Sequence, residues 1–221
     1  MENPIDKFWN FRLEKCKKAL ESNNFEVFTA KNHIQAKEII LEQIIPSTCS
    51  KSISYGGSIT LQKTDVLEHL RKDTELEFLE TLQYKGSREE IWERCRRALL
   101  VDLFITGTNA VTETGTLINL DMFGNRVGAI TFGPKYVVIL AGRNKIVADL
   151  ESGIFRVKNF AAPLNAIRHD LDHGKNTPCV KTSYCMDCKS PDRICNTWTI
   201  TEKSYPKYRV KVILINEELG L

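Results

Sequence analysis

Four cysteines near the C-terminal end carry the most distinctive chemistry of the sequence. The chain has seven cysteines, and four of them follow the pattern Cys-x5-Cys-x2-Cys-x6-Cys at Cys179, Cys185, Cys188 and Cys195. Thiolates at this density are typical ligands of zinc and of iron–sulfur clusters. The surrounding segment, residues 175–196, has few apolar residues to pack, so we predict that metal binding orders it. Small buried thiols without a metal are the alternative.

The spacing of these cysteines bears on which metal they bind. A zinc ribbon usually presents two close cysteine pairs, whereas here Cys185 and Cys188 form the one close pair. We therefore favour a 4Fe-4S cluster, with zinc as the alternative.

A small-residue turn, Gly56-Gly57-Ser58, follows a predicted strand and precedes a predicted helix. Because glycines allow close approach of the backbone, amides and hydroxyls at this turn can contact an anionic ligand at the start of the helix. An ordinary tight turn with Ser58 as the N-cap of the helix is the alternative.

A second polar run, residues 106–116, contains Thr108, Asn109 and Glu113 between two predicted strands. It reads as too polar for the core. Glu113 is a candidate nucleophile or general base if the site removes it from water, since desolvation raises the pKa of a carboxyl group and its reactivity. A solvated turn residue is the alternative.

Cationic side chains follow in two further turns. Asp121 and Arg126 flank Gly124-Asn125, which suits a tight hairpin, and the two side chains can pair or face a ligand. Lys145 lies at a predicted helix start after a strongly apolar strand, where a cation can neutralise a phosphate or carboxylate. A solvated basic turn is the alternative.

Helices and strands alternate over the first half of the chain, which predicts an α/β fold with a mostly parallel sheet flanked by helices. Beyond Gly107, closely spaced apolar runs at residues 116–120, 127–132 and 136–141 predict a strand meander. The remaining predicted strands are residues 25–30, 51–55, 76–79, 102–106, 197–201 and 209–215. The predicted helices are residues 8–20, 34–45, 58–70, 87–100, 146–157 and 163–171, the second of them stopping before Pro46.

The predicted parallel sheet indicates that the turn at Gly56–Ser58 and the turn after Gly107 lie close together. Ligands of parallel α/β sheets bind beyond the carboxyl ends of the strands, so the two polar turns are expected to border one crevice. The residues predicted to bind a small carboxylate or phosphorylated ligand there are Gly56, Gly57, Ser58, Thr108, Asn109, Arg126 and Lys145.

The length of the chain and its net charge indicate how many domains it forms and whether it binds nucleic acid. With 221 residues and 42% hydrophobic composition, residues 4–221 are expected to form a single domain that includes the cysteine-rich segment. Lysine and arginine total 31 against 28 acidic residues, a net charge of +3 that is too small and dispersed to indicate nucleic-acid binding.

The N-terminal residues 1–10 lack the apolar core of a signal peptide. The longest strongly apolar stretch, residues 136–141, is far shorter than the roughly 20 residues of a membrane span. We expect a cytoplasmic protein without a membrane span, in which the thiols stay reduced rather than forming a disulfide framework.

Several motifs, taken together, resemble those of the lactate-utilisation (LUD) family, both in their residues and in their order along the chain. They are Tyr55-Gly56-Gly57-Ser58-Ile59-Thr60-Leu61, Gly107-Thr108-Asn109-Ala110, Glu113-Thr114-Gly115-Thr116-Leu117, Gly124-Asn125-Arg126-Val127, Gly142-Arg143-Asn144-Lys145, Pro163-Leu164-Asn165-Ala166 and Asp192-Arg193-Ile194-Cys195-Asn196. The resemblance covers nearly the whole chain. It implies a NagB/RpiA/CoA transferase-like fold and a component of lactate or related organic-acid oxidation, with iron–sulfur or flavin oxidoreductases as partners.

The resemblance also leaves two other functions open. Glu113-x-Gly115 is similar to the glutamate–glycine motif that carries the nucleophile of coenzyme A transferases, which implies an acyl or CoA transferase using Glu113. The third possibility is a non-catalytic regulatory or ligand-binding subunit with structural zinc.

Overall fold

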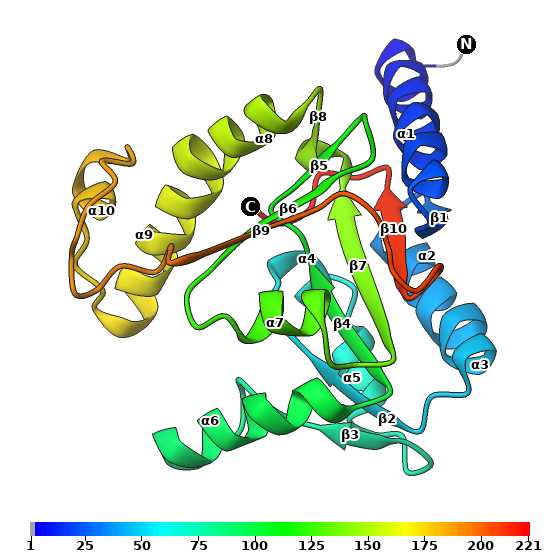
Figure 1. Cartoon of the computed structure of the whole chain (residues 1–221), viewed down its shortest axis with the longest axis horizontal. Coiled ribbons are helices and arrows are strands. Elements are labelled where there is room, and N and C mark those ends of the chain that lie inside the picture. Colours follow the sequence, from blue (N-terminus) through cyan, green and yellow to red (C-terminus); the bar gives the residue numbers. More distant parts are fainter. Residues whose placement is uncertain (1–2) are drawn as a thin grey trace.

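The central sheet of the protein is parallel throughout. The computed structural model describes residues 3–221, apart from the side chain of His173, and within that range six strands form this sheet in the order β1-β10-β7-β4-β2-β3 (Figure 1). Their bounds are β1 Glu26–Ala30, β10 Val210–Ile215, β7 Tyr136–Gly142, β4 Leu103–Gly107, β2 Ser52–Tyr55 and β3 Glu77–Leu79. Every neighbouring pair is parallel. The predicted α/β class with a mostly parallel sheet is confirmed.

A smaller mixed sheet stands beside the carboxyl ends of the central strands. Over the described residues it has the strand order β8-β5-β6-β9. The bounds are β8 Ile146–Val147, β5 Ala110–Thr112, β6 Leu117–Asp121 and β9 Thr197–Thr201. Strand β6 is antiparallel to both β5 and β9, while β5 and β8 are parallel. The long segment between β7 and β10 therefore contributes β8 and β9 to the small sheet before the chain returns to the central sheet at β10.

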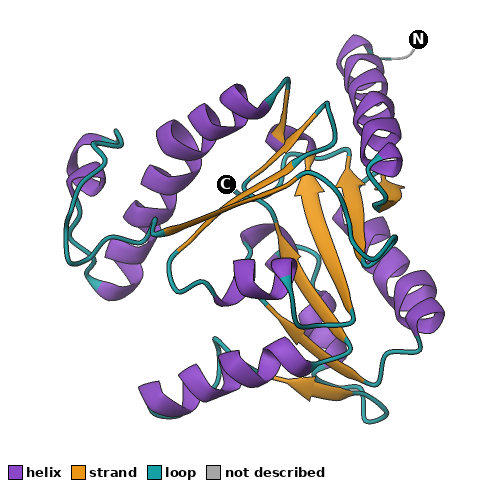
Figure 2. Cartoon of the chain, viewed as in Figure 1, coloured by secondary structure: helices purple, strands orange, loops and turns teal. Residues whose placement is uncertain are grey.

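Helices surround both sheets (Figure 2). Those of the first half are α1 Pro4–Ser22, α2 His33–Glu38, the π-helix η1 Ile39–Ile44, α3 Ile45–Thr48, α4 Ile59–Gln62, α5 Val66–Leu70, α6 Arg88–Arg97 and the 3-10 turn η2 Ala98–Leu100. Those of the second half are α7 Asn125–Thr131, the 3-10 turn η3 Arg143–Lys145, α8 Leu150–Arg156, the π-helix η4 Val157–Ala161, α9 Ala162–His173 and α10 Pro178–Thr182. In Figure 1, α9 and α10 form an arm on the opposite side of the molecule from α1.

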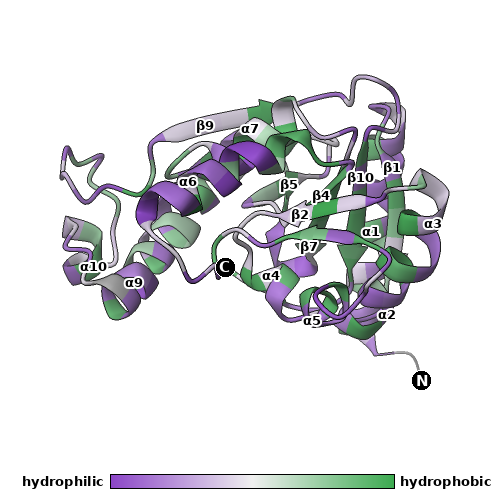
Figure 3. Cartoon of the chain, turned by 90° about the horizontal axis from the view of Figure 1, so that it is seen from below, coloured by the Kyte–Doolittle hydropathy of each residue, from purple (hydrophilic) through white to green (hydrophobic). Residues whose placement is uncertain are grey.

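The central sheet is apolar on both faces. On β7, Val138 and Leu140 pack in one cluster with residues of α2, α4 and α5. Val137 and Ile139 of the same strand pack in a second cluster with residues of α1. A parallel sheet covered on both sides buries successive residues of each strand, and Figure 3 accordingly shows its central strands as hydrophobic. The sheet therefore lies between two hydrophobic clusters.

Two helix caps predicted from the sequence are present in the structure. Ser58 caps α4 by accepting from the amide of Leu61 at 3.2 Å. Ser87 and Glu90 form the predicted capping box at the start of α6, each side chain accepting from the other residue's amide. Both caps satisfy backbone donors that the first helical turn leaves free.

One segment of the predicted meander is wrong. Residues 127–132 were expected to be a strand, but Asn125–Thr131 forms α7, with Gly124 at its N-cap in the left-handed region at φ 86°. Short apolar runs are ambiguous between helix and strand. Tertiary contacts decide here: Val127, Ala129 and Ile130 are buried, and Asp121 accepts from the amide of Arg126 at the helix start at 3.2 Å.

Other boundaries also differ. The helix expected to stop before Pro46 continues through η1 into α3, and Pro46 lies where the π-helical hydrogen bonding of η1 changes to that of α3. The helix expected over residues 58–70 is interrupted between α4 and α5. The segment 146–157 begins as strand β8, and its helix starts at Leu150 after the N-cap Asp149. In the described range, 3–221, none of the helices combines the length and apolarity needed to span a bilayer.

Candidate functional site

A crevice of about 450 Å³ lies beyond the carboxyl ends of β2 and β4. This volume falls within the range of small-molecule sites. Its walls come from the turn after β2, the end of β4, the start of α7, η3 and the inner face of α9. In Figure 3, the end of the chain, whose Leu221 also lines the crevice, lies between α4 and α9.

Six of the seven residues predicted to bind the ligand line this crevice together. They are Gly57, Ser58, Thr108, Asn109, Arg126 and Lys145. Gly56 lies immediately behind the wall, where a Cβ atom would stand 3.0 Å from Cγ of Arg126. Residues separated by up to 88 positions, the difference between 57 and 145, thus meet at one place because parallel strands end at the same edge of a sheet.

Arg126 connects the segments at this edge of the sheet, because every N–H of its guanidinium group donates a hydrogen bond. Its Nε donates to Asp121 at 3.2 Å. Its Nη1 donates to the carbonyl of Gly107 and to Asn119, and its Nη2 to Asn109 and the carbonyl of Leu120, at 2.7 to 3.1 Å. A guanidinium has five donor hydrogens, and here five acceptors occupy them. Arg126 therefore contributes positive charge to the crevice while its hydrogen bonds hold the walls.

Lys145 is the buried cation of the crevice. Its side chain is 4% exposed, and Nζ donates to the carbonyl oxygen of Thr108 at 3.0 Å. Burial lowers the pKa of Lys145 from its ordinary value to about 7, helped by the positive charges of Arg156 and Arg126. An amine with this pKa is partly neutral near pH 7, so it can act either as a cation or as a base.

Helix α9 adds polar residues that the sequence analysis did not include. Asn165, Arg168 and His169 line the crevice from one helix face, and Lys175 follows from the next turn. Their spacing of three and four residues is that of one helix face, a signal present in the sequence. Among the described side chains that line the crevice, four are cationic and one, Asp121, is a carboxylate; the cations are Arg126, Lys145, Arg168 and Lys175. Two of these cations also have carboxylate partners outside the lining, since Lys175 pairs with Asp192 at 3.0 Å and Arg168 with Asp172 at 3.7 Å. The crevice is suited to an anion.

The polar run after β4 is buried, contrary to the expectation that it is too polar for the core. Thr106, Thr108 and Thr112 are each at most 2% exposed. The hydroxyl of Thr108 lies 3.1 Å from the carbonyl oxygens of both Ala110 and Ile118. Threonine enters the interior here because backbone carbonyls of the small sheet accept its hydrogen bond.

Glu113 lies at the turn between β5 and β6, outside the described lining of the crevice. Its carboxylate accepts hydrogen bonds from Arg12 and Lys15, both on α1, the latter at 2.8 Å. Burial raises the pKa of Glu113, but the hydrogen bonds from Lys15 and Arg12 outweigh it, so the pKa is lowered. The geometry makes Glu113 an anchor for α1, and its catalytic role stays a prediction.

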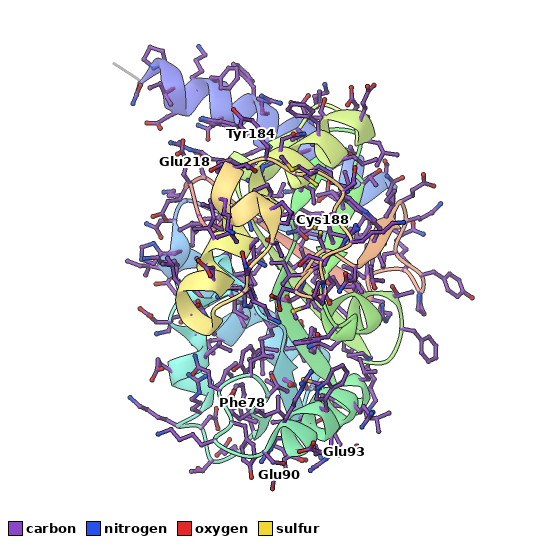
Figure 4. All side chains as sticks on the ribbon, turned by 90° about the vertical axis from the view of Figure 1, so that its left-hand side faces the viewer. Phe78, Glu90, Glu93, Tyr184, Cys188 and Glu218 are labelled. Atoms are coloured by element: carbon purple, nitrogen blue, oxygen red, sulfur yellow. The ribbon has the colours of Figure 1, made fainter. Side chains whose placement is uncertain are left out.

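The four clustered cysteines line one small cavity of their own. Cys179, Cys185, Cys188 and Cys195 surround it together with apolar residues of α9. Each cysteine is partly buried, and burial raises the pKa of the Cys195 thiol. Figure 4 places Cys188 and Tyr184 on the face of the molecule that carries α9 and α10, away from Glu90 and Glu93 of α6.

Arg193 ties the two ends of this loop. It donates to the carbonyl of Cys188 at 2.7 Å and to that of Cys195 at 2.9 Å. The Sγ atom of Cys179 lies 3.1 Å from the hydroxyl of Thr177. Thiols are the donor type that zinc and iron–sulfur centres use, so the chemistry of these residues fits a metal, although their arrangement in this structure does not gather them around one point. In the part of the chain that is described, no three His, Cys, Asp or Glu side chains are grouped so as to hold one metal ion.

A comparison with protein families decides the relationship of the chain. The model of the LUD domain matches residues 13–215. The chain belongs to the LUD family. This confirms the resemblance read from the motifs and links the protein to a family associated with lactate utilisation.

Solved structures agree with the LUD fold. The crystal structure of a DUF162 family protein from Deinococcus radiodurans has a TM-score of 0.54 and 13% identity, and the match covers 94% of this chain and 98% of that chain. At this identity the likeness concerns the fold. A search of curated proteins finds no match.

In this LUD protein the crevice and the cysteine cavity are neighbours. Ile194 lines both of them. Helix α9 separates them, with Asn165, Arg168 and His169 on the crevice side. The residues of α9 on the cysteine side are Ala162, Pro163 and Ala166. A ligand in the crevice and a group held by the cysteines would therefore stand on two faces of one helix.

Proposed function

We propose that this LUD protein is a component of lactate or related organic-acid oxidation that binds a small carboxylate in the crevice and holds a 4Fe-4S cluster with Cys179, Cys185, Cys188 and Cys195. The observation that carries the proposal is the shared wall: Ile194 and helix α9 border both cavities. Such proximity is what electron exchange between a bound organic acid and a metal centre requires.

The charge of the crevice supports a carboxylate ligand. Arg168 and Lys175 reach it from α9 and the turn that follows, and Lys145 lies at its buried end. Cations hold a carboxylate by charge-assisted hydrogen bonds. Arg126 is fully engaged by protein acceptors, so its part is to keep Asn109 and the end of β4 in place.

The four thiols are the ligands we assign to the cluster, and Arg193 preorganises their loop through the carbonyls of Cys188 and Cys195. Bound there, a 4Fe-4S cluster supplies one-electron transfer. Oxidation of a 2-hydroxy acid to a 2-oxo acid releases two electrons and two protons. A flavin or second iron–sulfur oxidoreductase is therefore the partner we propose for completing the reaction.

Anaerobic purification followed by iron, sulfide and zinc analysis tests the metal assignment. We expect iron and sulfide in equal amounts, with a broad brown absorbance that bleaches on reduction. Stoichiometric zinc without iron would replace the cluster by a structural zinc site. No metal at all would remove the cysteine centre from the proposal.

Calorimetry with pyruvate, L-lactate and inorganic phosphate tests the crevice. Arg168→Met and Lys175→Met should each weaken pyruvate binding about tenfold, which corresponds to about 1.4 kcal/mol. Arg88→Met is a matched control, because Arg88 is exposed at the start of α6. Equal affinity in all three variants would place the anion site elsewhere.

A further inference from the structure

Lys145 is a buried lysine without a carboxylate partner among the described residues. Lys145 lines the crevice, yet the residue is only 4% exposed. Among the ion pairs between described residues, none involves Lys145, and Nζ donates to the uncharged carbonyl oxygen of Thr108. Burying an amine without a carboxylate partner is costly when it is charged. The site therefore favours the neutral amine.

Charged neighbours on several elements reinforce this preference. Arg126 of α7 and Arg156 of α8 act on Lys145 with the same sign of charge. Arg168 and Lys175 line the same crevice, each paired with an aspartate, Asp172 and Asp192 respectively. The carboxylate of Asp121 is paired with Arg126 at 3.2 Å. A lysine that is desolvated and next to other cations is an activated nucleophile toward carbonyl carbon.

Backbone groups form the immediate surroundings of Nζ. Gly220 lies beside it, and a Cβ atom at that position would stand 3.3 Å from Nζ. The backbone there has φ 71°, which glycine adopts without strain. The carbonyl of Thr108 holds the amine in one orientation at 3.0 Å. The amine is thus positioned by backbone groups, in a residue that lines the crevice.

We propose that Lys145 is a nucleophile that captures the carbonyl carbon of a 2-oxo acid as an imine, while the carboxylate of the acid faces Arg168 and Lys175. The inference rests on the proposed binding of small carboxylates in the crevice and is independent of the cysteine cluster. It names the ligand class of that site: a 2-oxo acid, the product of 2-hydroxy acid oxidation.

The step balances without any redox partner. The lone pair of Nζ forms a bond to C2, the π electrons of the carbonyl move to oxygen, and that oxygen takes up a proton. A proton then passes from nitrogen to the hydroxyl group, and water leaves. One neutral amine, one 2-oxo acid and one proton thus give one protonated imine and one water.

The acid–base state of Lys145 supports selective reaction. Burial lowers its pKa to about 7, whereas an exposed lysine has a pKa of about 10.4. At pH 7 the neutral fraction of Lys145 exceeds that of an exposed lysine on the order of a thousandfold. A brief reaction near neutral pH should therefore modify this residue far ahead of the surface lysines.

Reductive trapping tests the inference. The full chain is incubated with pyruvate and sodium cyanoborohydride, which reduces imines in preference to ketones, and is then digested for peptide mass spectrometry. Among the lysines we expect one adduct, on Lys145, with a mass gain equal to pyruvic acid less one oxygen atom. The α-amino group, with an ordinary pKa of about 7.7–8.0, also reacts and is identified by its own peptide. The rate of adduct formation on Lys145 should rise from pH 6 to pH 8. L-Lactate, which has no ketone, should leave no adduct.

Three variants complete the experiment. Lys145→Arg and Lys145→Met both lack the Nζ amine and should form no adduct. Lys72→Met, at an exposed lysine after α5, should be trapped like the wild type. Pyruvate binding to the wild type without an adduct, or an adduct on another lysine, would overturn the imine while leaving the crevice intact. Absence of both binding and adduct would overturn the crevice proposal itself.

Discussion

The Nη2 atom of Arg126 donates to the Oδ1 atom of Asn109 at 2.9 Å. This bond joins α7 to the turn between β4 and β5, two segments that the local sequence does not connect. The same Asn109 Oδ1 accepts from the amide of Leu120 at 3.0 Å, so one side chain fixes the register of helix, turn and small sheet. Arg126 and Asn109 both line the crevice, so this hydrogen bond helps to fix the shape of its wall.

Replacement of Arg126 should therefore destabilise the whole protein. Arg126→Met removes the guanidinium donors to Asp121, Asn109 and Asn119 and to the carbonyls of Gly107 and Leu120. Asp121 and Asn109 each keep one backbone donor. Unsatisfied buried acceptors cost about 1–3 kcal/mol each, so we expect a loss of about 3 kcal/mol or more in the free energy of unfolding. Urea denaturation measures it. The control Arg96→Ala breaks an exposed pair with Glu93 and should change stability by less than about 0.5 kcal/mol. Equal midpoints for both variants would contradict the assignment.

Glu113→Gln separates anchoring from catalysis. We expect it to destabilise the protein by about 2 kcal/mol at pH 7, since charge-assisted hydrogen bonds to Arg12 and Lys15 are lost. The pKa of Glu113 is lowered in the folded state from its ordinary 4.5. Its contribution is therefore full above about pH 4.5 and lost as the pH falls through the folded value.

Thermal midpoints of wild type and Glu113→Gln between pH 7 and pH 3 check this. The difference between the two proteins should shrink below about pH 4.5, where the unfolded carboxyl also takes up its proton. A variant with normal stability and at least ~100-fold less activity would instead support the catalytic carboxylate. A covalent adduct on Glu113 with a thioester substrate would favour the transferase.

Cys188→Ser should lower the iron content and loosen the cysteine segment. Ligation by thiolates is coupled to folding of a loop that has little apolar packing. Anaerobic metal analysis and limited proteolysis of residues 175–196 measure the two effects. Cys49→Ser is the matched control, because Cys49 is an exposed free thiol at the end of α3. Unchanged metal content and protease resistance in Cys188→Ser would rule out this ligand.

Two glycines near the site should respond to alanine with opposite signs. A Cβ atom at Gly107 would lie 2.4 Å from Oγ of Ser58, displacing the N-cap of α4 at the crevice wall, so Gly107→Ala should cost about 1–2 kcal/mol. At Gly128, inside α7, the nearest atom would be 3.8 Å away. Gly128→Ala should stabilise the protein by about 0.5–1 kcal/mol. Chemical denaturation of both variants measures the difference, and a stabilised Gly107→Ala would contradict the close contact.

Local sequence was sufficient where the interactions are local. The apolar run of β4, the Ser58 cap and the Ser87–Glu90 capping box all follow from residues within a few positions of one another. Alternating helices and strands were sufficient for the parallel sheet. A parallel sheet in turn predicts that turns after its strands share one edge. Ser58, Thr108 and Lys145 do line one crevice.

Tertiary structure decided everything that depends on distant partners. Residues 127–132 were ambiguous as a pattern, and α7 forms because Arg126 finds acceptors on β4 and β6. Glu113 is engaged by α1, about a hundred residues earlier in the chain. The approach of the cysteine cavity to the crevice across Ile194 follows from the packing of α9. Burial and pairing depend on which segments pack together, and no short-range spacing encodes that.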